Sequence, residues 1–214
     1  MLSEMINKVI CGDCLPILKS LPDKCIDLVL TDPPYGIKRD KGFEGFGGFG
    51  KPIARKRYVG GWDDSRPKKE VFDEILRISK FALIFGGNFF ADILPQGNHW
   101  IFWDKLNTMP AFGDGELIWT NIDRNSVKKY TLQWNGLLGK EEFRHHPTQK
   151  PVTLMEYLLQ TYAEPTDLIC DPFAGSGSTL VACKKLNRRF IGIEISPEYC
   201  KIAEQRLKQG VLNF

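Results

Sequence analysis

Short apolar runs that end in Gly, Asp or Pro alternate with amphipathic stretches along this chain. Most of the apolar runs are nearly continuous, which is typical of strands buried on both faces of a sheet. This alternation indicates repeated strand–helix units and a mostly parallel sheet. The pattern predicts strands at 8–12, 26–31, 81–86, 99–104, 116–121, 167–171 and 189–194.

Amphipathic stretches between and after these runs have the spacing of helices. Val71, Ile75 and Ile78 recur at helical intervals and would share one face. Ser196 before Pro197 is typical of a helix start, because the Ser side chain caps free backbone N–H groups and Pro suits the first turn. The helices predicted in this way are 68–79, 151–162, 177–187 and 197–208. The expected fold class is α/β, with a mostly parallel twisted sheet and helices on both faces.

The length of 214 residues suits a single domain over 1–214, with a core large enough to need no disulfide or metal for stability. Hydrophobic residues make up 43% of the chain, too many for a disordered protein. The sequence has no apolar run near the roughly 20 residues of a membrane helix and no signal pattern at its start. We therefore expect a cytoplasmic protein that does not enter a membrane.

The six cysteines are scattered through apolar surroundings, so buried free thiols and no metal site are expected. Cys11 and Cys14 form one C-x-x-C pair, which with His145 and His146 leaves zinc as an alternative, although one such pair is weak support. The Pro-Cys nucleophile expected of a cytosine-C5 methyltransferase is missing.

The net charge of +3 conceals two basic segments, 36–70 and 123–150, that hold the whole surplus. The first is rich in glycine and aromatic residues, and its glycines predict a flexible basic loop at about 37–66. Basic side chains among aromatic ones suit phosphate contact with base stacking, although a solvated loop has the same composition. The candidate nucleic-acid contacts are Lys38, Arg39, Lys51, Arg55, Lys56, Arg57, Arg124, Lys128, Lys129 and Arg144.

A glycine-rich loop, Asp171-Pro-Phe-Ala-Gly-Ser-Gly-Ser-Thr179, joins a predicted strand to a predicted helix. Its glycines let the backbone approach a ligand, and the helix start offers free N–H groups. Glu194 ends the next strand, where a carboxylate can accept both hydroxyls of a ribose. Capping of the last helix is the alternative role of Glu194. Because no Lys follows the glycines, the loop is no triphosphate-binding loop, and a nucleoside-bearing cofactor is favoured.

The tetrapeptide Asp32-Pro33-Pro34-Tyr35 directly follows the apolar strand IDLVL. Successive prolines stiffen the chain and hold polar acceptors at the carboxyl end of that strand, where open α/β sheets bind their ligands. Asp32 and the Pro33 carbonyl are suited to accept hydrogen bonds from an amino group, and Tyr35 to stack on the ring that carries it.

These two motifs together resemble the paired signatures of the S-adenosylmethionine-dependent DNA amino-methyltransferases. The tetrapeptide precedes the glycine loop, so the chain is similar to the circularly permuted β group of that family. His146-Pro-Thr-Gln-Lys-Pro151 and Gly12-Asp13 fit the same pattern, and the motifs span residues 12 to 196. The resemblance implies a Rossmann-like methyltransferase fold in permuted order, with S-adenosylmethionine as cofactor.

The resemblance also assigns roles by position. It places the loop Phe173–Gly177 (Phe173, Ala174, Gly175, Ser176, Gly177) against the methionine part of the cofactor and Glu194 on the ribose. Asp13 would take the adenine amino group, although capping after the strand is an open alternative for it. Thr148 and Lys150 would seat the methionine carboxylate. The expected cofactor-binding set is completed by Cys14, Asp32, Asp171, Ser178, Thr179 and Ile195.

The implied reaction moves a methyl group to the exocyclic N6 of a flipped-out adenine in double-stranded DNA, with Asp32, Pro33, Pro34 and Tyr35 as catalytic residues. Asp at the first motif position favours adenine-N6 over cytosine-N4. An RNA or protein amino-methyltransferase and a catalytically silent DNA-binding module are the further alternatives. Target recognition is expected in a small insertion at about 105–145, and a homodimer and a cognate restriction nuclease outside this chain are compatible with the family.

Overall fold

A computed structural model describes residues 2–37, 64–107, 113–134 and 149–209 of the chain. Its centre is a sheet in the order β1-β8-β7-β2-β3-β5-β4-β6. All pairings are parallel except those that β5 makes with β3 and β4. The mostly parallel sheet expected from the sequence is therefore confirmed. The strands are β1 (Lys8–Cys11), β2 (Ile26–Thr31), β3 (Ser79–Phe85), β4 (His99–Asp104), β5 (Gly115–Thr120), β6 (Ser126–Thr131), β7 (Leu168–Asp171) and β8 (Arg189–Glu194).

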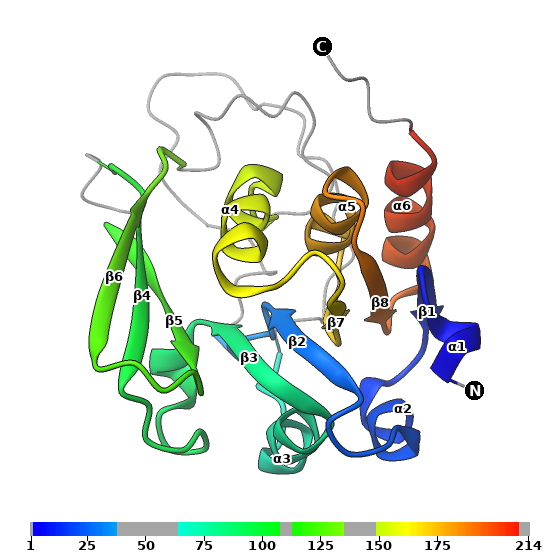
Figure 1. Cartoon of the computed structure of the whole chain (residues 1–214), viewed down its shortest axis with the longest axis horizontal. Coiled ribbons are helices and arrows are strands. Elements are labelled where there is room, and N and C mark those ends of the chain that lie inside the picture. The colour runs from blue at the N-terminus through cyan, green and yellow to red at the C-terminus, as the bar shows by residue number, and fades with distance from the viewer. Residues whose placement is uncertain (1, 38–63, 108–112, 135–148, 210–214) are drawn as a thin grey trace.

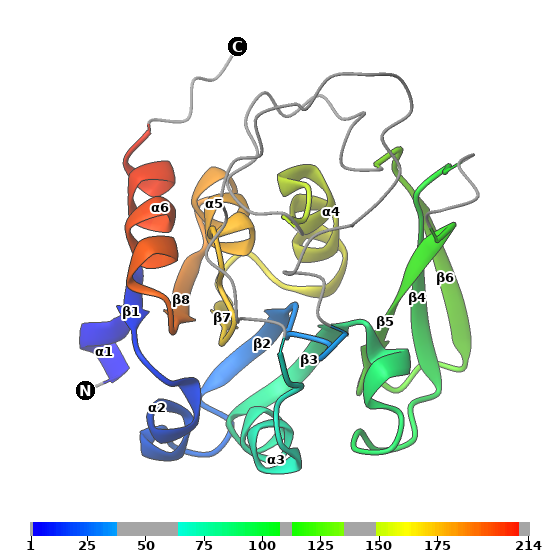
Figure 2. The ribbon, with the colours of Figure 1, turned by 180° about the vertical axis from the view of Figure 1, so that it is seen from behind.

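Helices cover both faces of this sheet, as Figures 1 and 2 show. One face carries α4 (Val152–Tyr162), α5 (Ser178–Lys185) and α6 (Pro197–Lys208). The other carries α2 (Cys14–Ser20) and α3 (Lys69–Ile78), while α1 (Leu2–Met5) packs beside β1 and the 3-10 helix η2 (Gly87–Phe90) beside β5. The described helices include none both long and apolar enough to span a membrane.

Alternate residues of the central strands serve two separate cores. In β2, Leu28 and Leu30 are fully buried beneath α4 and α5, whereas Val29 points into the core with α2 and α3. Burial of each such side chain contributes about 1.5–3 kcal/mol to folding. Because both faces are covered, the strand has no polar face, which explains the continuous apolar run IDLVL.

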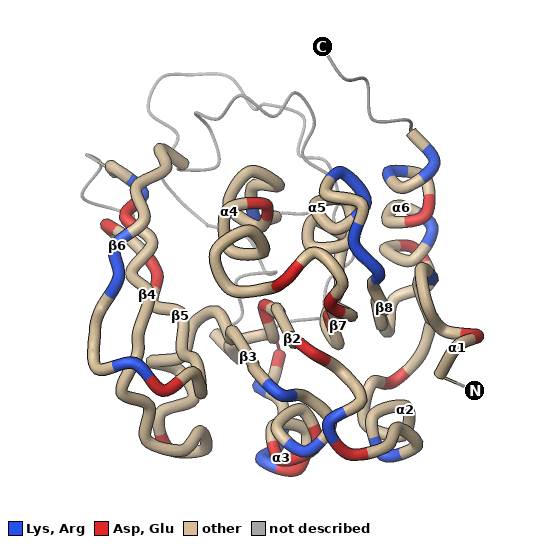
Figure 3. The backbone as a smooth tube through the Cα atoms, in the orientation of Figure 1, with Lys and Arg blue, Asp and Glu red and all other residues tan. Residues whose placement is uncertain are grey.

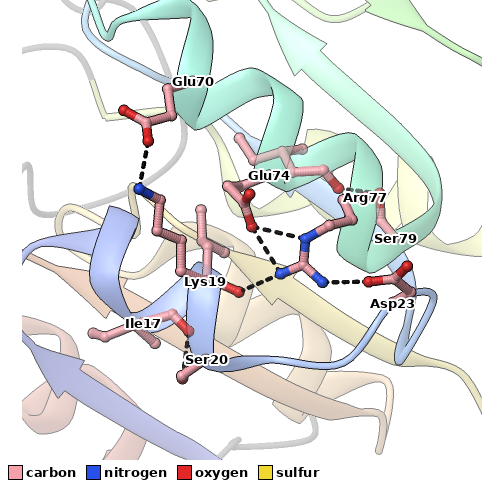
Figure 4. A network of polar contacts seen from close by, with 10 residues as sticks. Ile17, Lys19, Ser20, Asp23, Glu70, Glu74, Arg77 and Ser79 are labelled. Atoms are coloured by element: carbon pink, nitrogen blue, oxygen red, sulfur yellow. Dashed lines mark hydrogen bonds and ion pairs between the residues drawn. The ribbon is translucent and has the colours of Figure 1, made fainter.

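Charged side chains tie α2 to α3 at the surface (Figure 4). The Arg77 guanidinium of α3 donates to the Leu18 carbonyl of α2 at 3.0 Å and pairs with Asp23 at 2.5 Å. Lys19 and Glu70 form a second ion pair between the two helices. Exposed pairs of this kind contribute little individually, so the apolar core beneath them does most to fix the two helices.

The predicted strands and helices are all present, with boundaries shifted by at most two residues. The short elements α1, α2 and η2 and the edge strand β6 were not predicted. Strand β6 reads Ser-Val-Lys-Lys-Tyr-Thr and is mostly exposed, so it lacks the apolar run of a buried strand. Strand β5 also lies in the sheet, between β3 and β4, so two of the sheet's strands come from the interval 105–145 in which the recognition insertion was expected.

Candidate active site

The carboxyl ends of the parallel strands bring the sequence motifs to one edge of the sheet. In spatial order, Gly12 follows β1, Glu194 ends β8, Asp171 ends β7 and Asp32 follows β2. Residues near the start and the end of the chain thus become neighbours, and Gly12 N–H donates to the Glu194 carbonyl at 2.9 Å. Ligands of open α/β sheets bind at such an edge.

The glycine loop between β7 and α5 is held in a conformation that favours glycine. Gly175 and Gly177 have φ values of 52° and 83°, in the left-handed region. A Cβ at Gly175 would meet no atom of the described residues within 4 Å, so the backbone conformation is what favours glycine there. A Cβ at Gly177 would lie 2.9 Å from the Ala203 Cβ of α6. The loop therefore leaves room above Gly175 and packs tightly against α6 at Gly177.

The Glu194 carboxylate ties this loop to the start of α6. Its Oε2 accepts from Gly175 N–H at 2.7 Å, and its Oε1 accepts from Ser196 N–H at 2.8 Å. The residue is only 8% exposed, and burial raises the pKa of the carboxyl. Each carboxylate oxygen has a second lone pair, so these bonds are compatible with a ribose contact. Ile195 beside it is 68% exposed, an apolar side chain next to the expected ribose position.

Asp13 lies between β1 and α2 and caps the N-terminus of α2. Its side chain accepts from Leu15 N–H at 3.0 Å, which is the alternative left open by the sequence. Asp13 remains exposed, and a contact with a cofactor amino group stays a prediction. The next residue, Cys14, is buried, and burial raises the pKa of its thiol to about 12, so the thiol is protonated at neutral pH.

The Asp32 carboxylate is oriented by two donors. Tyr35 Oη donates to Oδ1 at 2.6 Å, and Lys150 Nζ donates to Oδ2 at 2.7 Å. The Asp32 side chain is 22% exposed, and its burial raises the pKa of the carboxyl against the opposing effect of the Lys150 ammonium. The structure thus brings Lys150, expected to bind the methionine carboxylate, to Asp32.

The Tyr35 ring packs against the short helix η2. It stacks on Phe89 of η2, with ring centroids 4.6 Å apart and an interplanar angle of 14°. Gly86, which precedes η2, has a φ of 65°, and a Cβ there would collide with the Tyr35 ring. Glycine at this position and the short η2 helix together fix the ring that the sequence predicts to stack on a base.

Lys150 also faces a second carboxylate, on Glu116 of β5. Lys150 Nζ lies 3.1 Å from Glu116 Oε2, and Lys105 Nζ donates to Glu116 Oε1 at 2.5 Å. Burial opposes the charge of Glu116, but the two ammonium groups outweigh it and lower its pKa to about 2. Sequence reasoning missed Glu116 because no motif contains it, and only the antiparallel pairing of β5 brings it to this edge.

A buried hydrogen bond joins the two halves of the edge. Thr31 Oγ1 donates to Asp171 Oδ1 at 2.7 Å, and Phe173 N–H donates to the same oxygen at 3.1 Å. Burial raises the pKa of the Asp171 carboxyl to about 6. Asp171 therefore links the end of β2 to the beginning of the glycine loop rather than facing the open edge.

Arg206 of α6 is a second residue that the motifs did not indicate. Its guanidinium donates to the Ser176 carbonyl at 2.7 Å and contacts the Ser176 hydroxyl at 3.2 Å. The Ser176 hydroxyl also donates to Gln149 Oε1 at 3.2 Å. The amphipathic spacing of 197–208 predicts the helix but not which polar residue turns toward the loop.

The expected nucleic-acid contacts are only partly described. Lys128 and Lys129 are exposed on β6, which carries basic residues drawn in blue in Figure 3, and Lys129 pairs with Asp104 at 3.0 Å. Arg124 precedes β6 at the opposite edge of the sheet, with its guanidinium 5.8 Å from the Tyr162 ring centroid. The other candidates lie outside the described residues: Lys38, Arg39, Lys51, Arg55, Lys56, Arg57 and Arg144.

Metal binding finds no support in the described part of the chain, where no group of three or more His, Cys, Asp or Glu is suited to a metal ion. Cys11 is exposed and Cys14 is buried. His145, His146 and the expected cofactor contact Thr148 lie outside the described residues.

Comparison with known proteins identifies relatives over nearly the whole chain. A family model described as DNA methylase, covering N6 and N4 methyltransferases, matches residues 96–205. The Type II methyltransferase M.HpaI of Haemophilus parainfluenzae is 31% identical, over 98% of this chain and 77% of the relative. The Type II methyltransferase M.HinfI of Haemophilus influenzae is 27% identical, over 97% of this chain and 70% of the relative.

Two solved structures share the fold at low sequence identity. The M1.HpyAVI complex with S-adenosylmethionine has a TM-score of 0.60 at 24% identity, over 94% of this chain and 98% of the other. The cytosine-N4-specific PvuII DNA methyltransferase has a TM-score of 0.61 at 16% identity, over 96% of this chain and 87% of the other. Both confirm the α/β fold with its mostly parallel sheet.

Proposed function

We propose, from the premise that this chain belongs to the N6/N4 DNA methylase family, that it methylates the N6 amino group of adenine in double-stranded DNA. Methyl transfer to an exocyclic amine of DNA is the activity of that family, and S-adenosylmethionine is its cofactor. The observation that carries the proposal is the meeting of Asp32, Tyr35 and Lys150 at the sheet edge that also holds Glu194 and the glycine loop.

The residues at this edge fit the cofactor. Glu194 keeps lone pairs for the ribose hydroxyls, the space above Gly175 admits a ligand close to the backbone, and Ile195 offers an exposed apolar surface. Asp13 is exposed at the end of β1, where it is suited to accept from an adenine amino group. When bound, S-adenosylmethionine supplies an electrophilic methyl group on its sulfonium.

Asp32 acts on the amine that receives the methyl group. The lone pair of an exocyclic amine is delocalised into the base, and a carboxylate that accepts its N–H favours a pyramidal nitrogen with a localised lone pair. If bound S-adenosylmethionine gave its methyl group to this amine, the sulfonium would leave as a neutral thioether, positive charge would grow on the nitrogen, and one N–H proton would then pass to solvent water. A well-placed negative group typically stabilises such a charge by ~3 kcal/mol. Tyr35 and Lys150 hold the carboxylate in one orientation and leave a lone pair on each oxygen.

A target base must leave the DNA stack to reach this edge, which costs a few kcal/mol. Tyr35, backed by Phe89, is placed to recover part of that cost by stacking. Lys128 and Lys129 are exposed on β6, whose carboxyl end lies at the same edge, so this strand offers positive charge to the phosphates. We infer that DNA approaches along the carboxyl edge from the side of β6.

Adenine is proposed as the target because Asp stands at the first position of the Asp32-Pro-Pro-Tyr35 motif. The test is incubation of the protein with labelled S-adenosylmethionine and mixed-sequence DNA, followed by digestion to nucleosides. We expect labelled N6-methyladenine. Label in N4-methylcytosine would overturn the adenine assignment and leave the reaction class standing, whereas no label in DNA and label in RNA or protein would overturn the proposed function.

A further inference from the structure

Four side chains of alternating charge form a continuous row that starts at the proposed catalytic residue. Asp32 pairs with Lys150 at 2.7 Å, Lys150 with Glu116 at 3.1 Å and Glu116 with Lys105 at 2.5 Å. The side chains of Lys150, Glu116 and Lys105 are 7%, 16% and 18% exposed. Ion pairs this well buried are strongly coupled, because little water screens them.

The two carboxylates on either side of Lys150 share one ammonium. Asp32 accepts its hydrogen bond, whereas Glu116 Oε2 is buried and has no hydrogen-bond donor among the described residues, so its contact with Lys150 is electrostatic. The ammonium also lies 5.1 Å from the Phe85 ring centroid and 5.7 Å from that of Tyr35. Glu116 is thus the counter-charge that holds Lys150 between the two carboxylates rather than on Asp32 alone.

We propose that Glu116 is a positioning residue for methyl transfer, which acts through Lys150 to keep the Asp32 carboxylate available to the target amine. The proposal rests on the catalytic role of Asp32 stated above. Without the Glu116 charge, the Lys150 ammonium is balanced by Asp32 alone and moves toward it. The carboxylate then has less negative charge to offer an amine, and its orientation changes.

Glu116 belongs to β5, in the interval that the sequence assigns to target recognition, and Lys105 stands at the end of β4. The row of charges therefore links Glu116 of β5 and Lys105, directly after β4, to Asp32, directly after β2. Among the described residues, the other charged and titratable groups that act on Asp32 are Tyr35 on its own loop and Asp171 at the end of β7.

The first test compares Glu116→Gln with the wild type in steady-state methylation. A change of about 1 Å at a catalytic group costs up to roughly 100-fold in rate, so we expect kcat to fall between about 10- and 100-fold. The dissociation constant of S-adenosylmethionine should stay within about twofold, because Glu116 does not contact the glycine loop. Glu116→Asp keeps the charge and should recover part of kcat.

The pH profile separates positioning from a purely structural role. The Glu116 charge raises the pKa of Asp32, which must be ionised to act. Its removal should therefore shift the acidic limb of the kcat profile to lower pH, while Glu116→Asp should leave that limb near its wild-type position. Loss of stability alone would lower the amount of active enzyme and, through acid unfolding, would move the limb to higher pH and not to lower pH.

Glu156→Gln is the matched control, because Glu156 pairs with Lys185 at 2.9 Å between α4 and α5 and is similarly buried. It should leave kcat and the acidic limb unchanged.

If Glu116→Gln matches the wild type in both while Asp32→Ala is inactive, the inference is wrong and the proposed function stands. If Asp32→Ala keeps full activity, the proposed function fails. If Glu116→Gln does not fold, Glu116→Asp tests the inference instead. A shift of its acidic limb would overturn the inference, and so would a kcat as low as that of Asp32→Ala.

Discussion

The two halves of the candidate site are built in different ways. Around Glu194, backbone N–H groups from Gly175 and Ser196 converge on one carboxylate, and all three residues lie within the consecutive elements β7, α5, β8 and α6. Around Asp32, side chains from distant positions meet: Lys150 lies 118 residues away along the chain. The cofactor half therefore depends mainly on local backbone geometry, and the target half on the packing of the whole sheet. Each half can be damaged without the other, which the following variants test.

The largest effect is expected from Asp32→Ala. Removal of a group that stabilises charge in the transition state typically costs 100- to 1,000-fold, and the loss of orientation adds to this, so we expect kcat to fall at least about 1,000-fold. The dissociation constant of S-adenosylmethionine, measured by calorimetry, should change by less than about threefold.

Asp23→Ala is the control for this variant, because Asp23 pairs with Arg77 at the surface and lies far from the carboxyl edge. It should keep wild-type kcat. Substantial methyl transfer by Asp32→Ala would contradict the division of the site into two halves.

The second variant, Asp171→Asn, tests the residue that joins the halves. The folded-state pKa of about 6 lies above the usual value of 3.8 because the carboxyl is buried. The stability that this raised pKa contributes is fully present below about pH 4 and is lost as pH rises through about 6. Relative to the variant, the wild type should therefore lose roughly 2–3 kcal/mol of unfolding free energy between these pH values. Urea unfolding at several pH values measures this, and a difference that is independent of pH would contradict it.

The third variant, Glu194→Ala, is aimed at the cofactor half. Hydrogen bonds to a charged group contribute about 1.5–3 kcal/mol, and this carboxylate also holds the loop, so we expect the dissociation constant of S-adenosylmethionine to rise by roughly 10- to 100-fold. Glu198→Ala, in the first turn of α6, is the control and should bind normally. At saturating cofactor, the kcat of Glu194→Ala should reach most of the wild-type value. An unchanged dissociation constant would remove the ribose role of Glu194.

The contrast between the halves also explains what the sequence could predict. The glycine loop, Glu194 and the helix that follows are signalled by residues close together, and the structure places them as expected. Asp32 was found because its motif is local. Glu116 was not found, because it comes close to Lys150 only when β5 pairs antiparallel with β3, on the side of β3 that faces away from β2. A single sequence records no such pairing.

Burial explains the elements that the sequence did not predict. Strand β6 is at the edge of the sheet that the described residues form and keeps Val127, Lys128 and Lys129 exposed, so no apolar run distinguishes it from a loop. Helix α2 has only seven residues, fewer than a clear helical period requires. The central strands were predicted because both of their faces are covered, and their hydrophobic signal is correspondingly strong.

The smallest effect is expected from Arg206→Ala, which removes a contact between α6 and the glycine loop of the cofactor half. The guanidinium donates to the Ser176 carbonyl and also contacts the Ser176 hydroxyl, so its loss removes these charge-assisted contacts from the loop without touching Glu194 or Asp32. The loop then samples more conformations, and S-adenosylmethionine must pay the ordering cost when it binds. A hydrogen bond to a charged group contributes up to about 3 kcal/mol, but Arg206 is only part-buried and acts on the loop indirectly, so we expect about 1–1.5 kcal/mol and roughly a 5- to 12-fold rise in the dissociation constant.

Arg189→Ala is the matched control, because Arg189 donates to the Thr166 carbonyl at 2.7 Å near the opposite edge of the sheet. It should leave the dissociation constant unchanged. For Arg206→Ala, kcat at saturating cofactor should equal that of the wild type, since the charge row at Asp32 is intact. A fall in kcat with normal cofactor binding would instead mean that the two halves are coupled through α6, and that the division drawn between them is wrong.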